Sequence, residues 1–117
     1  MARAATTSDV FNAIAEPRRR EIIDLLADGL EKPVGDLVHR LRIPQPAVSK
    51  HLSVLRRVRV VSVSRRGRSR MYRLNPRELK PIHDWIKMYE KFWTTHISRI
   101  KQRAEQIARN QQTQKEN

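Results

Sequence analysis

The sequence predicts a mainly α-helical domain with one small antiparallel β-hairpin, and three observations support this expectation. Apolar residues recur at intervals of three and four over most of the chain, which is the spacing of amphipathic helices. One segment, residues 61–74, instead alternates apolar and polar residues on both sides of a glycine, as hairpin strands do. The length of 117 residues suits one domain with one modest core.

Short helices are expected in the first part of the chain. Ser8 can cap the first of them. Pro17 suits the first turn of a second helix over residues 17–28, because the first N–H groups of a helix lack partners anyway. Gly29 stands where a left-handed residue would end that helix. A third helix is expected over residues 34–42, where apolar residues follow the i, i+3, i+4, i+7 pattern.

A fourth helix is predicted in "PQPAVSKHLSVLRR", residues 44–57, and it follows the third after a tight connection. Two short amphipathic helices joined in this way have helix-turn-helix spacing. On a helical wheel Val48, Leu52 and Leu55 share the buried side, and His51 lies at its margin. The opposite side carries short, polar or cationic residues, namely Pro46, Ser49, Lys50, Ser53 and Arg57, with Gln45 at the N-terminal end. Such a side suits close approach to a DNA major groove, although any helical hairpin has an outer polar face.

The next segment predicts a basic β-hairpin. Valines alternate with serines at residues 61–64, apolar residues flank an arginine at residues 72–74, and Gly67 lies at the tip between them. The arginines around the tip are Arg65, Arg66, Arg68 and Arg70. Guanidinium groups clustered directly after a helix-turn-helix suit a phosphate backbone or a minor groove, so the whole segment predicts a winged helix-turn-helix. An Arg-rich loop that only keeps the chain in solution is the alternative.

The charge balance favours polyanionic partners. The chain has 25 Lys and Arg residues against 12 Asp and Glu residues, a formal net charge of +13, which attracts nucleic acid. There are two alternatives: the basic surface contacts only water, or it binds an anionic membrane. The apolar runs are too short to span a bilayer, and no signal peptide is recognised. We therefore expect a soluble cytoplasmic protein that does not enter membranes. The lack of cysteine excludes disulfides and thiolate metal sites.

A long last helix is expected over residues 81–107, after the capping sequence Asn-Pro-Arg-Glu at residues 75–78. Its wide apolar and aromatic stripe includes Trp85, Tyr89, Phe92, Trp93, His96 and Ile100. A core this small hardly absorbs so many aromatic rings, so a second subunit is expected to cover them in a homodimer. The expected organisation is a flexible segment 1–7, a domain over residues 8–100 and a flexible polar tail over residues 108–117.

Four motifs, "AIAEPRRREIIDLLADG", "VGDLVHRL", "QPAVSKHLSVLRR" and "SRRGRSRMYRL", in this order resemble the ArsR/SmtB family of winged-helix repressors. The resemblance implies that the fourth helix enters the major groove of double-stranded DNA, that the hairpin touches the adjoining backbone, and that the protein is a dimer in a bacterium or archaeon, associated with the nucleoid through its DNA. The implied base or phosphate contacts are Gln45, Ser49, Lys50 and His51. Pro44 and Arg59 depart from the family pattern, which often has a capping Ser and a Gly at these positions. Arg59 must therefore adopt a left-handed conformation, or the fourth helix must end differently.

Many members of this family release DNA when they bind a metal ion, but the corresponding ligands are missing here. Pro33 and Gly35 stand near the place where the family's thiolate pair aligns, and the last helix lacks the Asp-x-His and His-x-x-Glu patterns of its other common site. His83 and His96 lie about 220° apart around the helix, so only a dimer brings two such residues to one ion. We expect no metal and no other cofactor, and the sequence identifies no small-molecule inducer.

The function favoured by the sequence is that of a sequence-specific transcriptional regulator, a repressor that binds an inverted-repeat operator as a homodimer. A non-specific architectural DNA- or RNA-binding protein also fits the charge, but the predicted strands carry no aromatic platform for stacking bases. A winged helix that binds another protein is a further alternative. An enzyme is not expected, because no catalytic set of side chains and no glycine-rich phosphate loop is recognised in a chain with 3 glycines.

Overall fold

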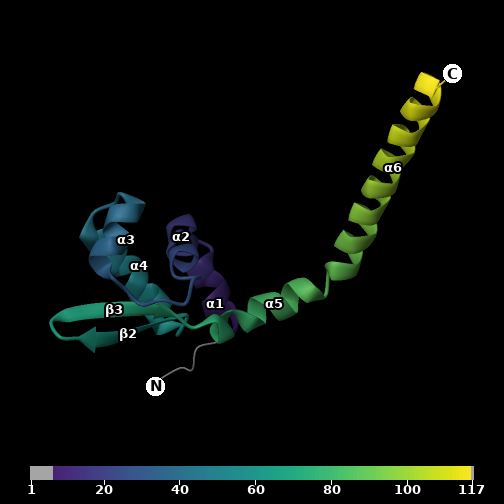
Figure 1. The fold of residues 1–117 in the computed structure, drawn as a ribbon. Coiled ribbons are helices and arrows are strands. Elements are labelled where there is room, and N and C mark those ends of the chain that lie inside the picture. Colours follow the sequence, from purple (N-terminus) through teal and green to yellow (C-terminus); the bar gives the residue numbers. More distant parts are fainter. Residues whose placement is uncertain (1–6, 117) are drawn as a thin grey trace. The chain divides into compact units, whose positions relative to one another are not determined.

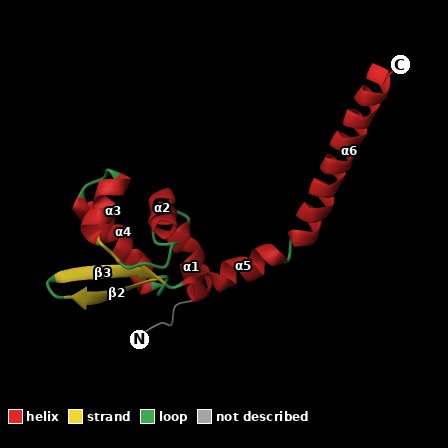
Figure 2. Cartoon of the chain, viewed as in Figure 1, coloured by secondary structure: helices red, strands yellow, loops and turns green. Residues whose placement is uncertain are grey.

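The structure is a computed structural model in which residues 7–116 are described. In chain order its elements are α1 (Thr7–Ile14), α2 (Pro17–Leu25), β1 (Lys32–Pro33), α3 (Val34–Leu41), α4 (Gln45–Arg57), β2 (Val61–Arg66), β3 (Ser69–Leu74), the 3-10 helix η1 (Pro76–Leu79), α5 (Lys80–Lys87) and α6 (Glu90–Glu116) (Figure 1). Helices dominate, and the strands form one small antiparallel sheet, which confirms the predicted fold class (Figure 2). The contacts divide the chain into two compact units, Met1–Ile82 and His83–Asn117.

The first two helices begin close to where the sequence places them. α1 starts at Thr7, so Ser8 lies inside the helix rather than at its cap. Apart from Thr7, the segment 1–7, which was expected to be flexible, lies outside the described residues. α2 begins at Pro17, as predicted, but ends at Leu25 instead of residue 28. The chain then turns toward Gly29, whose φ of 81° is the expected left-handed conformation.

The helix-turn-helix consists of α3 and α4, which are in contact with each other. Arg42 ends α3 in a left-handed conformation with a φ of 57°, and Pro44 caps α4 with an extended backbone. Pro46 lies in the first turn of α4, where its missing N–H leaves no hydrogen bond unmade. Val48, Leu52 and Leu55 are fully buried, as their spacing predicts. Both helices therefore begin and end within one residue of the prediction.

The predicted hairpin is present and gains a third strand. β2 pairs antiparallel with β3 in a register that runs from Val61 opposite Leu74 to Arg66 opposite Ser69. The two-residue turn between the strands begins with Gly67, whose φ of 63° suits the first central position of a type II′ turn. The two-residue strand β1 pairs with the other edge of β3, so the strand order is β1-β3-β2. β1 was not predicted, because a strand of two residues that contains a proline has no alternating pattern in its sequence.

The core of the first unit lies between the helices and the base of the sheet. Its buried residues are Val10, Ala13, Ile22, Leu26, Leu37, Leu41, Val48, Leu52, Leu55, Val58, Val60, Val61, Tyr72 and Leu74. Val61, Val63, Tyr72 and Leu74 occupy alternate strand positions opposite one another, so they share the face of the sheet that packs on this core. α4 is therefore held by the core on one side and by its contacts with β2 near its end.

The C-terminal part differs from the prediction of one helix over residues 81–107. The helix is interrupted at Met88 and Tyr89, where the N–H groups of these residues donate to the carbonyls three residues earlier, those of Trp85 and Ile86. The prediction is thus wrong at this point, and no proline or glycine marks the break. α6 then continues to Glu116, so most of the segment expected to be a flexible tail is helical. Its Ala, Arg, Gln and Lys residues are good helix formers, which explains the extension.

Candidate nucleic-acid interface

The outer side of α4 carries the residues that the sequence singled out. Gln45, Pro46, Ser49, Lys50, Ser53 and Arg57 are all exposed. They lie opposite the buried Val48, Leu52 and Leu55, so the helix presents short and polar side chains along its length. The side chains of Pro46, Ser49 and Ser53 extend little from the helix, whereas those of Lys50 and Arg57 reach further. The structure contains no DNA, and contact of these residues with bases or phosphates stays a prediction.

A groove joins the beginning of α4 to the hairpin. Gln45 and Ser49 line it from the helix, and Arg68, Ser69 and Arg70 line it from the turn and β3. Its remaining walls are Pro33, Val34 and Tyr72, and its volume is about 310 Å³. Residues from two predicted sets, one on the helix and one on the hairpin, thus lie around a single hollow. The sequence predicted both sets separately, and the structure places part of each together.

The hairpin tip concentrates positive charge. Arg65 lies directly opposite Arg70 across the two strands, and Arg68 occupies the turn. Like charges placed opposite one another destabilise a hairpin, so this arrangement does not serve the stability of the sheet. Arg65, Arg68 and Arg70 are exposed and form no ion pair with an acidic side chain in residues 9–114. Their charges are available to an anionic partner such as a phosphate group.

Arg66 differs from the other hairpin arginines. Its Nε donates a hydrogen bond to Oε2 of Glu31 at 3.1 Å, and the Ser64 hydroxyl donates to Oε1 of the same carboxylate at 3.3 Å. The hydrogen bond from Arg66 is the main cause that lowers the pKa of the Glu31 carboxyl below its ordinary value. The Arg66 charge is therefore partly compensated within the protein, which the sequence did not indicate.

β1 is fastened by a second ion pair. The Lys32 ammonium donates to both carboxylate oxygens of Asp28, at 2.8 and 2.7 Å, and the lysine residue as a whole is buried. The hydrogen bond from Lys32 and another from the N–H of Leu30 lower the pKa of Asp28. Because Lys32 lies opposite Tyr72 in the sheet, this pair connects the turn after α2 with β3. It holds the strand that forms one wall of the groove.

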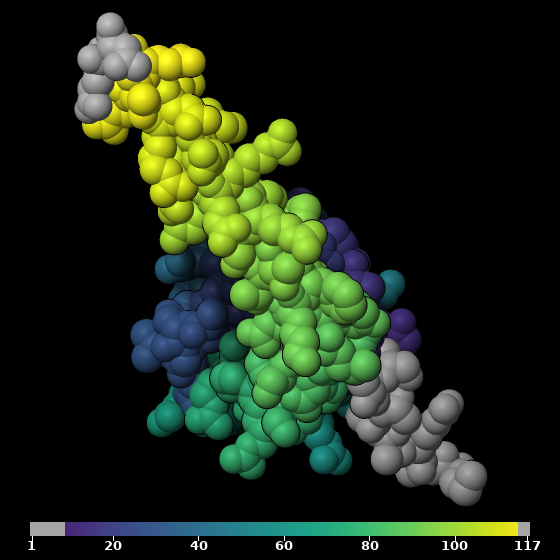
Figure 3. All heavy atoms as spheres, turned by 90° about the vertical axis from the view of Figure 1, so that its right-hand side faces the viewer, coloured from purple at the N-terminus to yellow at the C-terminus, as the bar shows by residue number. Residues whose placement is uncertain are grey.

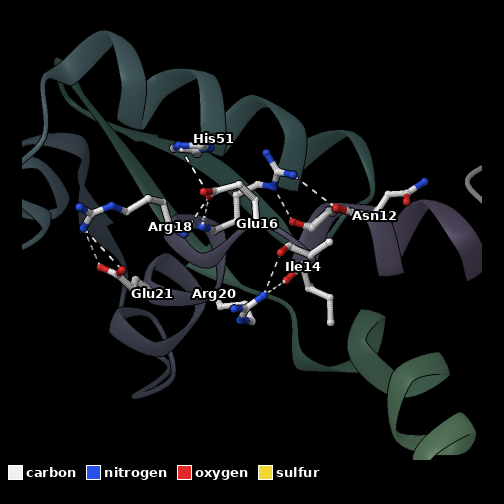
Figure 4. A network of polar contacts seen from close by, with 10 residues as sticks. Asn12, Ile14, Glu16, Arg18, Arg20, Glu21 and His51 are labelled. Atoms are coloured by element: carbon white, nitrogen blue, oxygen red, sulfur yellow. Dashed lines mark hydrogen bonds and ion pairs between the residues drawn. The ribbon is translucent and has the colours of Figure 1, made fainter.

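The His51 side chain does not lie on the outer side of α4 but points toward the start of α2. Its Nε2 lies 3.9 Å from Oε2 of Glu16, and its side chain is 20% exposed (Figure 4). Glu16 caps α2 by accepting hydrogen bonds from the N–H groups of Arg18 and Arg19 at 2.8 and 3.2 Å. The structure thus brings His51 to the start of α2 rather than to the groove. Its implied role in DNA contact stays a prediction.

The run of arginines at the start of α2 has a structural role. Arg19 donates from its side chain to the carbonyls of Asn12 and Ala13, and Arg20 donates to that of Ile14 at 2.8 Å (Figure 4). These carbonyls end α1, where the helix dipole favours cations. Arg57 also lies near this end of the domain, because it lines a hollow together with Asp9 and Asn12 of α1. The structure does not bring Arg57 to the groove.

The second unit carries an exposed apolar stripe. Trp85, Tyr89, Phe92, Trp93 and Ile100 are 50%, 42%, 70%, 54% and 56% exposed, and His96 is exposed as well. Within α6, Trp93, Ile97, Ile100 and Ile107 recur at intervals of three, four and seven residues, so they lie on one side of the helix. Figure 3 shows one face of this helix, in light green to yellow, with its side chains at the surface. Exposed apolar side chains gathered on one side of a helix are typical of interaction sites.

In the part of the chain that the structure describes, no three His, Asp or Glu side chains gather in a way that could hold a metal ion. None of the described helices combines the length and the apolar character needed to cross a bilayer.

Comparison with known proteins places this geometry in a family. Residues 16–63 match the family described as "Bacterial regulatory protein, arsR family". The transcriptional repressor SdpR of Bacillus subtilis is 37% identical over 79 residues, which cover 68% of this chain and 87% of that protein. The HTH-type transcriptional regulator Rv2034 of Mycobacterium tuberculosis is 35% identical over 88 residues, which cover 75% of this chain and 78% of that protein.

Solved structures agree with the sequence relatives. The crystal structure of a possible transcriptional regulator for arsenical resistance has a TM-score of 0.61 and 34% sequence identity, over 73% of this chain and 84% of that chain. An ArsR-like transcriptional regulator from Rhodococcus sp. RHA1 has a TM-score of 0.62 and 28% identity, over 82% of this chain and 90% of that chain. The family resemblance predicted from the sequence is confirmed: the chain belongs to the arsR family of bacterial regulatory proteins.

Proposed function

We propose that this protein regulates transcription by binding an inverted-repeat operator in double-stranded DNA as a homodimer, and that it represses by occupying a promoter. Its family is one of DNA-binding transcriptional regulators and not of enzymes. The observation that carries the proposal is the groove in which Gln45 and Ser49 of α4 lie beside Arg68 and Arg70 of the hairpin. SdpR is named a transcriptional repressor, which is the activity we propose here.

The two sides of the groove suit two kinds of contact. The exposed side of α4 carries the short side chains of Pro46, Ser49 and Ser53, which suit a helix in a major groove, and the Gln45 amide can both donate to and accept from a base edge. Arg65, Arg68 and Arg70 of the hairpin have no acidic partner among the described residues, which suits phosphate oxygens beside that groove. In this arrangement α4 supplies the sequence preference and the hairpin supplies most of the salt-dependent affinity.

The exposed stripe of the second unit supports a homodimer. Phe92, Trp93 and Ile100 are each more than half exposed, and burying such side chains against a second copy removes a large apolar area from water. Copies of one chain pair most simply about a two-fold axis, with the same patch on both subunits. Two α4 helices related in this way enter successive major grooves about 34–36 Å apart. The operator is then an imperfect inverted repeat with half-sites one helical turn apart, and the protein acts in the cytoplasm on the nucleoid.

Selection of bound fragments from a random duplex pool tests the function. The proposal predicts enrichment of one inverted repeat, two chains per duplex in sedimentation, and much weaker binding to a scrambled duplex at the same salt concentration. Enrichment of no sequence, with equal affinity for all duplexes and for RNA, would favour the non-specific architectural protein. No binding to any nucleic acid at low salt would favour a protein-binding winged helix.

A further inference from the structure

We propose that Glu31 is a positioning residue that keeps Arg66 away from DNA and so limits the affinity of the hairpin for phosphate, independent of sequence. The proposal rests on the proposed function, because it concerns how the hairpin of a DNA-binding regulator contacts its ligand. It assigns a role to a residue that precedes β1 and lies far in sequence from the hairpin.

The contacts of Glu31 extend across the sheet. β3 is the central strand, so the edge strands β1 and β2 are not neighbours. Pro33 and Ser64 both lie opposite Met71, which places them in one row on one face. Glu31 precedes β1, and its carboxylate accepts hydrogen bonds from Ser64 and Arg66 on the far edge strand, β2. Because Ser64 and Arg66 are two positions apart on β2, both project from that face, which is the one turned away from the core.

The carboxylate separates the hairpin arginines into two groups. Arg65 and Arg70 belong to the opposite face, and no acidic side chain of the described residues pairs with them. Of the four arginines around the hairpin tip, only Arg66 forms an ion pair with an acidic side chain of the described residues. The Glu31 carboxylate offsets the positive charge of Arg66 on that face, which also carries Arg73. Arg65 and Arg70 have no acidic partner among the described residues, while the face with Arg66 carries one carboxylate beside two arginines, Arg66 and Arg73.

This division has a consequence for DNA binding. A phosphate that approaches Arg66 also approaches the Glu31 carboxylate, whose repulsion opposes the attraction of the guanidinium. Arg66 bonds to Glu31 through its Nε, so its terminal nitrogens can still face a phosphate, but the carboxylate beside them opposes the approach of an anion. In the parent protein a phosphate contact of Arg66 therefore adds little to the number of counterions released. Removing the carboxylate should convert Arg66 into an additional phosphate contact.

The test uses salt titrations of binding to a selected and a scrambled duplex. The variants are Glu31→Gln, Arg66→Ala, their combination, and Arg65→Ala as a control of equal charge on the other face. We expect Glu31→Gln to strengthen binding to both duplexes and to steepen the log-affinity against log-salt slope by about 0.9, which is about 3.5-fold between 50 and 200 mM salt. In the parent, Arg65→Ala should flatten the slope by about 0.9, whereas Arg66→Ala, which leaves the Glu31 carboxylate unpaired but removes no full phosphate contact, should flatten it by less. In the Glu31→Gln background, Arg66→Ala should flatten it by about 0.9.

The outcomes separate the proposal from a purely structural role of Glu31. If the carboxylate only stiffens the hairpin, Glu31→Gln weakens binding, and Arg66→Ala changes the salt slope equally in the parent and in the Glu31→Gln variant. Either result would overturn the proposal. Should Glu31→Gln fail to fold, the comparison of Arg66→Ala with Arg65→Ala in the parent still decides, because equal flattening of the slope contradicts the proposal. A parent protein that binds no duplex would refute the proposed function itself, and that result is distinguishable from a failure confined to these variants.

Discussion

The side-chain amide of Asn75 donates a hydrogen bond to the carbonyl oxygen of Arg59 at 2.9 Å and so supports a strained turn at the end of α4. Arg59 has a φ of 66°, in the left-handed region that favours glycine. The Val60 N–H donates to the Leu55 carbonyl at 3.0 Å, and the Arg59 N–H donates to that of Arg56 at 2.9 Å. These two bonds are those of a Schellman motif, and the left-handed alternative expected for Arg59 is confirmed.

The Arg59→Gly variant should be more stable than the parent. Glycine adopts a positive φ without the steric cost that an L side chain meets, about 1 kcal/mol, although it also makes the unfolded chain more flexible. We expect the free energy of unfolding to rise by a few tenths to about 1 kcal/mol in urea titrations. Arg59→Ala is the control, because it removes the same charge and keeps the strain. Equal stability of the glycine and alanine variants would show that the backbone stores no strain here.

Stability should fall in acid because of two carboxylates. The pKa values of Asp28 and Glu31 are lowered in the folded protein by hydrogen bonds from Lys32 and Arg66 respectively. Each carboxyl therefore takes up a proton more readily in the unfolded chain, so its contribution is complete above the ordinary carboxyl pKa of about 4 and is lost as pH falls through the lowered value. We expect the melting temperature to decrease below pH of about 4.5, and to decrease less in the double variant Asp28→Asn, Glu31→Gln. An equal decrease in both proteins would assign the acid sensitivity to other groups.

The Trp93→Asp variant should be a monomer. Trp93 is half exposed in the single chain, and on our proposal its indole packs against a second copy, where a buried carboxylate would lack a partner. Sedimentation at micromolar concentration should show a dimer for the parent and a monomer for the variant. Thr95→Asp adds the same charge on the other side of α6 and should leave the dimer intact. A parent that sediments as a monomer would remove the basis of the inverted-repeat operator.

The Arg70→Ala variant should weaken binding to every duplex alike. Arg70 lines the groove and has no acidic partner in the described residues, which suits a phosphate contact. Losing one such contact should flatten the log-affinity against log-salt slope by about 0.9 on the selected and on the scrambled duplex. Arg109→Ala removes an equal charge from α6 and should leave the slope unchanged. A changed sequence preference with an unchanged slope would show that Arg70 reads bases instead.

Local patterns made much of the first unit predictable. The i, i+3, i+4, i+7 spacing of apolar residues identified α3 and α4, because one face of each helix packs on the core. Alternation around Gly67 identified β2 and β3 for the same reason. The wheel also placed His51 at the margin of the buried side, where it contacts Glu16. Each of these features depends on neighbours a few residues apart.

Features that depend on distant neighbours could not be predicted in this way. β1 exists because Lys32 and Pro33 pair with a strand that lies far along the chain, and their own sequence carries no strand pattern. The contact of Glu31 with Arg66 has the same origin. The break between α5 and α6 has neither a proline nor a glycine as its signal, and the apolar stripe continues through it.

The most direct test of the proposed reading of α4 compares the parent with the Gln45→Ala, Ser49→Ala double variant on a selected and a scrambled duplex at one salt concentration. Both side chains are exposed and line the groove, and neither carries charge. If they contact base edges, the variant should lose roughly 1–3 kcal/mol per contact on the selected duplex and almost nothing on the scrambled one. Equal losses on both duplexes would contradict the proposal, because α4 would then contact only the DNA backbone.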